Sequence, residues 1–280
     1  MKGQLAELLG EEYGAAGIWF DGWWDQQVKK LPHLNRPDAD PKETQIDWRL
    51  RETFDLIHEL RPEALIGNNH HVGVFPGEDF QMFEKDLPGQ DFAGGNEDAV
   101  IGELPLEMCE TINDYWGYNK DDQNFKSAKD LIRLLVRAAG FDANLLLNIG
   151  PMGSGKIQPE FVERLEQIGA WMEKNGESIY GTRGGPLEPQ PWGVTTRKGG
   201  TVFVHVLEDE KAGEGADGGR KIELALGEGV KVQSARLMHG GEVKFEQSGQ
   251  GTKAVILHLP EGALDLVDTI VVLETEEISD

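Results

Sequence analysis

The sequence predicts an α/β protein in which a parallel sheet or barrel is followed by an antiparallel β-sandwich. Helix-period and strand-period segments alternate over about the first 180 residues, and repeated alternation of this kind is typical of parallel sheets. After Gly184-Gly185-Pro186 the chain changes to short alternating or apolar runs that Gly-rich turns separate, which indicates antiparallel strands. We therefore expect two domains, 1–185 and 186–280.

The first part of the chain contains four helical segments and three strands. Ser127 and Asp130 form a capping pair that predicts a helix start, and Gly176 stands where a C-cap glycine belongs. The apolar run at 143–149 lacks alternation, which predicts a fully buried strand. In chain order, we expect a helix with Leu5, Leu8, Leu9 and Tyr13, a strand at 17–20, a helix at 48–60, a strand at 64–67, a helix from Ser127, a strand at 143–149 and a helix from Pro159.

The second part is expected to hold only strands. Each run is short and ends at a turn rich in glycine or acidic residues. The expected strands lie at 201–207, 221–226, 230–237, 254–259 and 269–273.

Charge and cysteine content exclude several classes of protein. The 280 residues include 50 Asp and Glu against 27 Lys and Arg, a net charge of -23, which disfavours binding to nucleic acid or an anionic membrane. Cys109 is the single cysteine, so neither an internal disulfide nor a cysteine-rich zinc site is expected. The segment after Met1 lacks the apolar region of a signal peptide, and we expect a cytoplasmic protein without a cofactor.

The strand at 17–20 ends at a carboxylate, Asp21, with Trp19, Trp23 and Trp24 beside it. An acid at the C-terminal end of a buried parallel strand lies where barrel enzymes place their catalytic groups. The tryptophans add a surface on which a sugar ring can stack. The alternative is a strand-to-turn Asp-Gly pair next to core tryptophans.

A second strand end is also polar. The strand at 64–67 runs into His70 and His71, and we expect 75–84 to be a loop that includes the acids Glu78 and Glu84. Two adjacent histidines without a nearby cysteine or third histidine favour hydrogen bonding to sugar hydroxyls over metal binding, so no metal is expected. One acid at a strand end and a second on a following loop is the minimal requirement of a glycosidase.

Six motifs in this order resemble the α-L-fucosidases of glycoside hydrolase family 29. The resemblance covers nearly the whole chain. The motifs are Gly17-Ile-Trp-Phe-Asp-Gly-Trp-Trp, Ile66-Gly-Asn-Asn-His-His, Pro76-Gly-Glu-Asp-Phe, Glu107-Met-Cys-Glu-Thr-Ile-Asn-Asp-Tyr-Trp-Gly-Tyr118, Asn144-Leu-Leu-Leu-Asn-Ile-Gly-Pro151 and Gly176-Glu-Ser-Ile-Tyr-Gly-Thr-Arg183.

The resemblance implies a retaining exo-α-L-fucosidase with a (β/α)8 (TIM-type) barrel followed by a β-sandwich. Asp21 matches the family's nucleophile and Trp19 an aromatic residue of the fucose pocket. The acid/base of the family ends an Asp-Phe-x-x-x-Glu segment, which places it at Glu84, with Glu78, Glu107 and Glu110 as reserve candidates. Many members carry an arginine that touches the sugar where this chain has His70.

Other substrate-binding residues are expected around the same strand ends. They are Trp23, His70, His71 and Glu78. The implied partner is a fucosylated oligosaccharide or glycoside.

The chain departs from the family at its front. The chain begins one helix before the nucleophile strand, so the implied barrel is incomplete and lacks roughly its first three strands. The sheet of such a barrel has an open edge, and an open edge favours association with another chain. We expect a homo-oligomer, a dimer or higher, to complete the open barrel. The alternatives are that the chain is an inactive fragment or that a separate partner chain completes the barrel.

Two alternatives to a fucosidase stay open: a non-catalytic carbohydrate-binding fragment and a metallohydrolase that uses His70 and His71.

Overall fold

The computed structural model describes residues 1–22, 47–93, 96, 100–207, 213–214, 220–226, 230–247, 254–260 and 262–276. The chain divides into two compact units, Met1–Cys109 and Glu110–Asp280. This division is separate from the change of strand pattern near Pro186, and the boundary between 1–185 and 186–280 stays a prediction.

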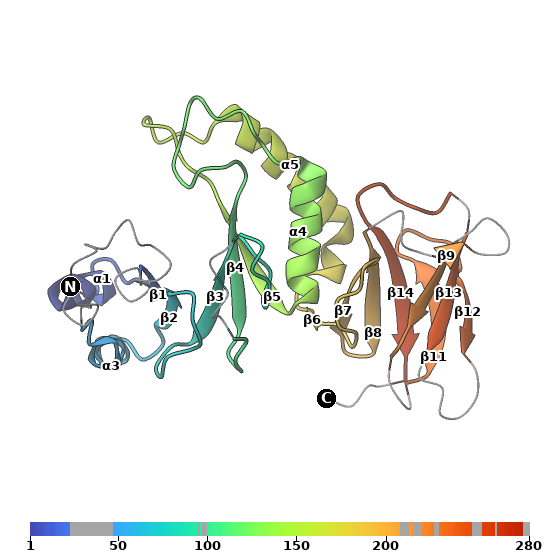
Figure 1. Ribbon diagram of the computed structural model, residues 1–280, viewed down its shortest axis with the longest axis horizontal. Coiled ribbons are helices and arrows are strands. Elements are labelled where there is room, and N and C mark those ends of the chain that lie inside the picture. The colour runs from blue at the N-terminus through green and yellow to red at the C-terminus, as the bar shows by residue number, and fades with distance from the viewer. Residues whose placement is uncertain are drawn as a thin grey trace, which may run out of the picture. The chain divides into compact units, whose positions relative to one another are not determined.

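The first unit is built on parallel strands that pair in sequence order (Figure 1). Strand-period and helix-period segments alternate here as the sequence predicts. The elements are α1 (Lys2–Leu9), β1 (Gly17–Asp21), α3 (Leu50–Leu60), β2 (Leu65–Asn69), β3 (Phe80–Glu84) and β4 (Leu106–Thr111), whose last two residues belong to the second unit.

Helices α1 and α3 cover one face of β1 and β2 because their apolar residues fall on one side. Phe54 and Ile57 of α3 are fully buried and pack with Ile66 of β2, and Ile18 and Phe20 of β1 join the same cluster. Phe20 and Phe54 contact each other with ring centroids 5.6 Å apart. Alternation along β1 therefore turns its odd-numbered residues to the opposite face.

One prediction for this unit is wrong. The segment 75–84 is not a loop throughout, because Phe80–Glu84 forms β3 and pairs with β2 and β4. Met82 and Phe83 are buried and Gln81 is also covered, so burial of the apolar residues outweighs the polar character of the flanking segment. Glu84 consequently ends a strand, as Asp21 does.

The second unit begins with helices and one strand and ends with antiparallel sheets. Ser127 caps α4 by accepting a hydrogen bond from the Asp130 backbone N–H at 3.1 Å, as its sequence predicts. The helices and the strand are α4 (Ala128–Gly140), β5 (Ala143–Asn148) and α5 (Pro159–Asn175).

The burial of β5 differs from its prediction. Only Ala143 of β5 is buried and Leu146 is 44% exposed, whereas Leu147 packs against an apolar cluster, so the strand is covered on one face and not on both. Gly176 is the C-cap of α5, as the sequence predicts; it has right-handed conformation and begins a 3-10 turn. A Cβ there would lie 3.0 Å from the ring of Tyr180, so close packing explains the glycine.

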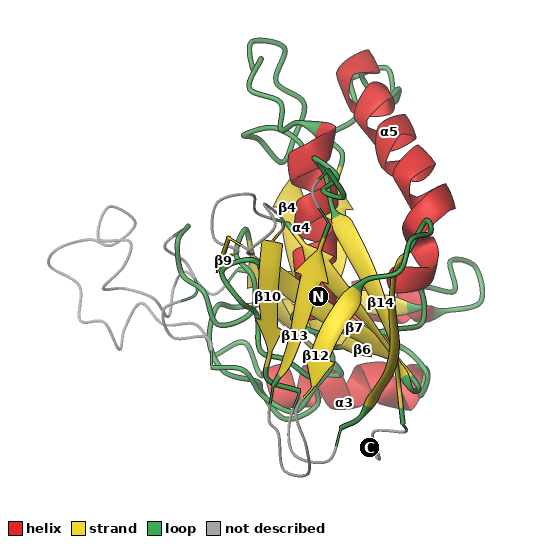
Figure 2. Ribbon diagram, turned by 90° about the vertical axis from the view of Figure 1, so that its right-hand side faces the viewer, coloured by secondary structure: helices red, strands yellow, loops and turns green. Residues whose placement is uncertain are grey.

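The remaining strands form two antiparallel sheets that share one apolar core (Figure 2). All five strands expected after residue 200 are present, and β6, β7, β9 and β12 are additional. The first sheet has the order β11-β14-β8-β7-β6 and the second β12-β13-β10-β9. The bounds are β6 (Arg183–Gly184), β7 (Gly193–Lys198), β8 (Thr201–Val206), β9 (Gly213–Glu214), β10 (Arg220–Leu224), β11 (Val232–Leu237), β12 (Lys244–Gln247), β13 (Val255–Leu259) and β14 (Thr269–Thr275).

The first of these sheets is buried on both faces. Val202 and Val204 of β8 face the second sheet, whereas Phe203 packs on the other side with Ile270 of β14 and with Trp171 of α5. None of the described helices is long and apolar enough to cross a membrane.

Candidate active site

Three neighbouring parallel strands of the first unit end in polar side chains that lie close together. Asp21 is the last residue of β1, Asn69 of β2 and Glu84 of β3. Asp21 pairs in register with Asn69. Because the carboxyl ends of parallel strands share one edge of the sheet, the three side chains converge where α/β proteins place their ligands.

The amide of Asn69 joins the two carboxylates. Its Nδ2 donates to Glu84 Oε2 at 2.8 Å and to Asp21 Oδ1 at 3.3 Å. Both distances end on the same nitrogen, so Asp21 Oδ1 and Glu84 Oε2 are at most about 6 Å apart, the sum of the two distances. The two carboxyl groups of inverting glycosidases are ~6.5–9.5 Å apart and those of retaining glycosidases ~5–5.5 Å apart. The bound on this oxygen pair is shorter than the inverting range and compatible with the retaining one.

Trp19 lies on the same face of the sheet as Asp21, two residues earlier along β1. It is 40% exposed, and its side chain interacts with the carboxylate of Glu107 in β4. Partial burial raises the pKa of Glu107 above its usual value, and the Trp19 hydrogen bond opposes that shift. Trp19 therefore lies near a polar group while much of its ring stays open to a ligand.

Gly67 makes room on this face. It lies opposite Trp19 in β2 and opposite Phe80 in β3, and a Cβ on Gly67 would lie 2.1 Å from the Phe80 ring. The Phe80 ring thus lies directly over the backbone of Gly67. This contact explains why β2 carries a glycine in its interior.

His71 contacts Glu84 from the loop after β2. Its Nε2 lies 3.5 Å from Glu84 Oε2, and its Nδ1 lies 3.3 Å from Asn96 Oδ1. Asn96 in turn donates its side-chain amide to the Glu84 backbone carbonyl at 3.0 Å and to Asp86 at 3.2 Å. The Glu84 carboxylate is 27% exposed, so it is held from two sides and still open to a ligand.

His70 and Glu78 form a buried pair instead. His70 Nε2 lies 2.7 Å from Glu78 Oε1, and the side chains are 2% and 1% exposed. The Val72 backbone N–H donates to His70 Nδ1 at 3.2 Å, so Nε2 carries the ring proton and donates to Glu78. Glu78 also accepts the Phe75 backbone N–H at 3.0 Å. Both carboxylate oxygens of Glu78 are therefore engaged within the loop.

The other predicted residues fall in different places. Glu110 lies in the second unit, where it accepts from Thr111 and lies 3.4 Å from Lys126 Nζ. Trp23 lies outside the described residues. Within the part of the chain that the structure describes, no group of three or more His, Cys, Asp or Glu is arranged to hold a metal ion.

Sequence reasoning did not single out Asn69 and Asn96 as site residues. Asn69 could have been found, because it ends the strand next to Asp21 in the motif Ile66-Gly-Asn-Asn-His-His. Asn96 carries no such signal, since it reaches Glu84 from a loop 12 residues later.

Comparison with known proteins agrees with this geometry. Residues 1–177 match the family model Alpha-L-fucosidase. The chain belongs to the α-L-fucosidase family. Tissue α-L-fucosidase of Homo sapiens is 38% identical over 190 residues, which cover 66% of this chain and 34% of the human protein.

Solved fucosidase structures are similar along nearly all of the chain. α-L-Fucosidase isoenzyme 1 from Paenibacillus thiaminolyticus matches with a TM-score of 0.71 and 30% identity, covering 99% of this chain and 62% of that protein. The α-L-fucosidase of a Vibrio species matches with a TM-score of 0.70 and 26% identity, covering 98% and 44%. The chain thus spans about a third of the human relative and less than two thirds of either of these structures.

Proposed function

We propose that this chain carries the catalytic carboxylates of a retaining exo-α-L-fucosidase that removes terminal fucose from glycosides. The observation that carries the proposal is the pair Asp21 and Glu84, which end two parallel strands and share the Asn69 amide. One oxygen of each lies within about 6 Å of the other, which favours the close spacing of a retaining pair over the wider spacing that admits a water in an inverting mechanism. Membership of the fucosidase family supports the choice of sugar.

The two carboxylates divide the chemistry. Asp21 attacks the anomeric carbon of fucose and forms an ester, while Glu84 gives its proton to the departing glycosidic oxygen. Glu84 then takes a proton from water, which attacks the anomeric carbon and releases fucose and the Asp21 carboxylate. An acceptor hydroxyl that replaces this water would yield a transfucosylation product.

The surrounding residues would bind the sugar. Trp19 offers its ring face next to Asp21, and its side chain interacts with Glu107. His71 contacts the Glu84 carboxylate and lies where it can hydrogen-bond a sugar hydroxyl or the leaving group. His70 and Glu78 would contribute by holding the loop after β2 in place. Trp23 is the remaining residue that we propose to bind the sugar.

The proposed architecture is an incomplete (β/α)8 barrel followed by a β-sandwich, assembled as a homo-oligomer. Among the described residues β1 pairs only with β2, so one of its edges is open, and Leu65 of β2 is 56% exposed. Such an edge favours pairing with another chain. Light scattering should show a mass of a dimer or more, and a fully active monomer of 31.0 kDa would contradict this assembly.

Hydrolysis of 4-nitrophenyl α-L-fucoside tests the function. We expect turnover with initial release of the α-anomer of fucose, detected by proton NMR, because two inversions retain configuration. Initial release of the β-anomer would contradict a retaining mechanism. Saturable binding of fucose without any turnover would instead indicate a carbohydrate-binding fragment.

A further inference from the structure

Asn96 is a buried side chain whose partners fix the orientation of its amide. It is 4% exposed, and its Nδ2 donates to the Glu84 backbone carbonyl at 3.0 Å and to Asp86 Oδ2 at 3.2 Å. A backbone carbonyl can only accept, so the nitrogen of the amide lies on that side and the oxygen on the other. Asn96 Oδ1 lies 3.3 Å from His71 Nδ1. Because Oδ1 can only accept, His71 Nδ1 carries a proton.

The proton on Nδ1 determines what His71 offers to Glu84. Its Nε2 lies 3.5 Å from Glu84 Oε2, and in the neutral ring this nitrogen is an acceptor. The distance is longer than that of a formed hydrogen bond, but hydrogen bonds of catalytic groups are often long without substrate and shorten when it binds. An acceptor here can take a hydrogen bond from a protonated Glu84 and not from its carboxylate. His71 therefore favours the form of Glu84 that can donate a proton.

Asn69 acts on Glu84 in the opposite sense. Its Nδ2 donates to Glu84 Oε2 at 2.8 Å, and a hydrogen-bond donor stabilises the charged form of a carboxyl group. A general acid has to keep its proton until the leaving oxygen takes it. With the proton of His71 on Nε2 instead, Glu84 would face two donors and its carboxylate would be favoured. The orientation of the Asn96 amide thus decides whether the His71 contact supports the acid or the carboxylate.

We propose that Asn96 and His71 are positioning residues for proton transfer by Glu84, an inference that rests on the proposed role of Glu84 as the acid/base. Asn96 keeps the His71 proton on Nδ1, and His71 Nε2 accepts from Glu84 in its acid form. Glu84 gives that proton to the glycosidic oxygen as the bond to the anomeric carbon breaks. The proton that Glu84 later takes from water restores the same hydrogen bond.

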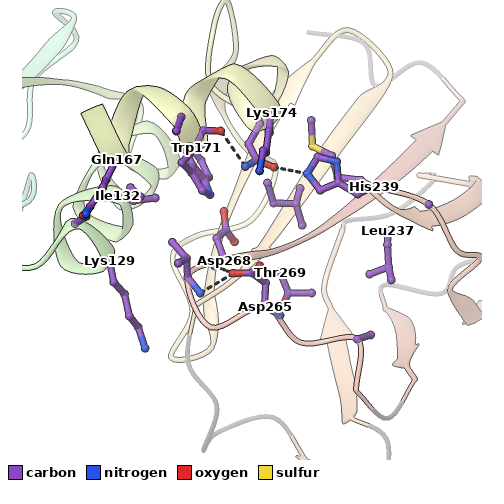
Figure 3. A pocket seen from close by; sticks show the side chains of 18 residues that line it. Lys129, Ile132, Gln167, Trp171, Lys174, Leu237, His239, Asp265, Asp268 and Thr269 are labelled. Atoms are coloured by element: carbon purple, nitrogen blue, oxygen red, sulfur yellow. Dashed lines mark hydrogen bonds between the residues drawn. The ribbon is translucent and has the colours of Figure 1, made fainter. Parts of the chain in front are cut away.

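His239 of the second unit provides a matched comparison, because an asparagine also fixes its proton. Asn175 Nδ2 donates to the Trp171 carbonyl at 3.0 Å, so Asn175 Oδ1 is the acceptor of the bond to His239 Nε2 at 2.7 Å (Figure 3). His239 therefore carries its proton on Nε2, whereas His71 carries its proton on Nδ1.

Nitrogen-15 NMR of the full chain with labelled histidine tests the two assignments without any turnover. The spectra of His71→Asn and His239→Asn identify the two rings. Near neutral pH we expect a proton bonded to Nδ1 in His71 and to Nε2 in His239. Asn96→Ala should remove the proton from His71 Nδ1 and place it on Nε2, where the Glu84 carboxylate accepts it, and leave His239 unchanged. A His71 ring without a proton on Nδ1 in the parent chain, or one that Asn96→Ala does not change, would overturn the proposal.

Two fucosides with different leaving groups test the effect on catalysis. His71→Asn keeps an amide that can reach Asn96 and removes the group that faces Glu84. In His71→Asn and in Asn96→Ala we expect kcat on a fucosylated disaccharide to fall at least about tenfold, with KM unchanged. The loss on 4-nitrophenyl α-L-fucoside should stay below about threefold, because an activated phenol leaves without needing a proton. His239→Asn should match the parent chain on both substrates.

Equal losses on both substrates, or a change in KM alone, would indicate a purely structural role and overturn the proposal. Asn96 is buried, so His71→Asn decides the question on its own if Asn96→Ala does not fold. A parent chain that cleaves neither fucoside contradicts the proposed function. An active parent chain in which His71 Nδ1 lacks a proton contradicts only the positioning role.

Discussion

Asn69 donates from its side-chain amide to Glu84 at 2.8 Å, and the same nitrogen lies 3.3 Å from Asp21. One neutral side chain at the end of β2 thus holds two acidic groups at the ends of the strands on either side, β1 and β3. An amide hydrogen bond to a carboxylate is stronger than one between neutral groups and fixes the direction of the oxygen. Asn69 is therefore a positioning residue for both carboxylates.

Replacing Asn69 should lower activity without unfolding the chain. In Asn69→Ala both carboxylates lose their common donor, and loss of a hydrogen bond to a charged group is worth about 1.5–3 kcal/mol, or roughly a 10- to 160-fold fall in kcat. Asn69→Asp should be worse, because it places a third acid between the two. Steady-state kinetics on 4-nitrophenyl α-L-fucoside measure this. An Asn69→Asp variant as active as the parent chain would show that the bridge has no role.

Asp21→Ala should remove turnover almost completely. The proposed nucleophile forms the covalent intermediate, so we expect a loss of about 10³-fold or more in kcat. Added azide should restore part of the rate by occupying the space of the lost carboxylate. Asp55→Ala on the exposed surface of α3 is the matched control and should keep full activity. More than about a tenth of the parental rate in Asp21→Ala would exclude the role.

Glu84→Gln should affect substrates according to their leaving groups. A general acid contributes about 10²–10⁴-fold when the leaving oxygen needs a proton, and much less when the leaving group is an activated phenol. We expect a strong loss on a fucosylated disaccharide and a mild one on 4-nitrophenyl α-L-fucoside. Glu78→Gln disturbs the buried pair with His70, so it should lower the unfolding temperature and slow both substrates equally. The opposite pattern for the two variants would assign the acid/base to Glu78.

The strand-end position of Asp21 was predictable from the sequence because an apolar run stops there at an acid. Glu84 was predicted through the family motif but not as a strand end, since Phe80–Glu84 follows directly on the turn residues Pro76-Gly77-Glu78-Asp79 and was not separated from them. The hydrogen-bond partners of the two carboxylates could not be predicted from the sequence. Asn69 acquires its role from strand register and Asn96 from the path of a loop, and neither is visible in local periodicity.

The raised pKa of Glu107 predicts a dependence of stability on pH. Burial favours its protonated form, so the folded chain binds more protons than the unfolded chain between the ordinary carboxyl pKa and the raised one. The contribution of Glu107 to stability is therefore greatest below that window and falls as pH rises through it. Glu107→Gln keeps an acceptor for Trp19 and removes the charge. Thermal unfolding from pH 4 to 7 should show a smaller decline for the variant, and identical curves would contradict the assignment.

The packing of Gly67 against Phe80 predicts a loss of stability in Gly67→Ala. An added Cβ would lie 2.1 Å from the aromatic ring, so the ring or strand β2 must move, and such overpacking costs about 1–3 kcal/mol. Gly153→Ala is the matched control, because a Cβ at Gly153 meets nothing within 4 Å. Urea unfolding measures both variants. Because the cost arises from one contact, Phe80→Leu should make the Gly67→Ala substitution less harmful, and a double mutant whose losses simply add would show that Phe80 is not the cause.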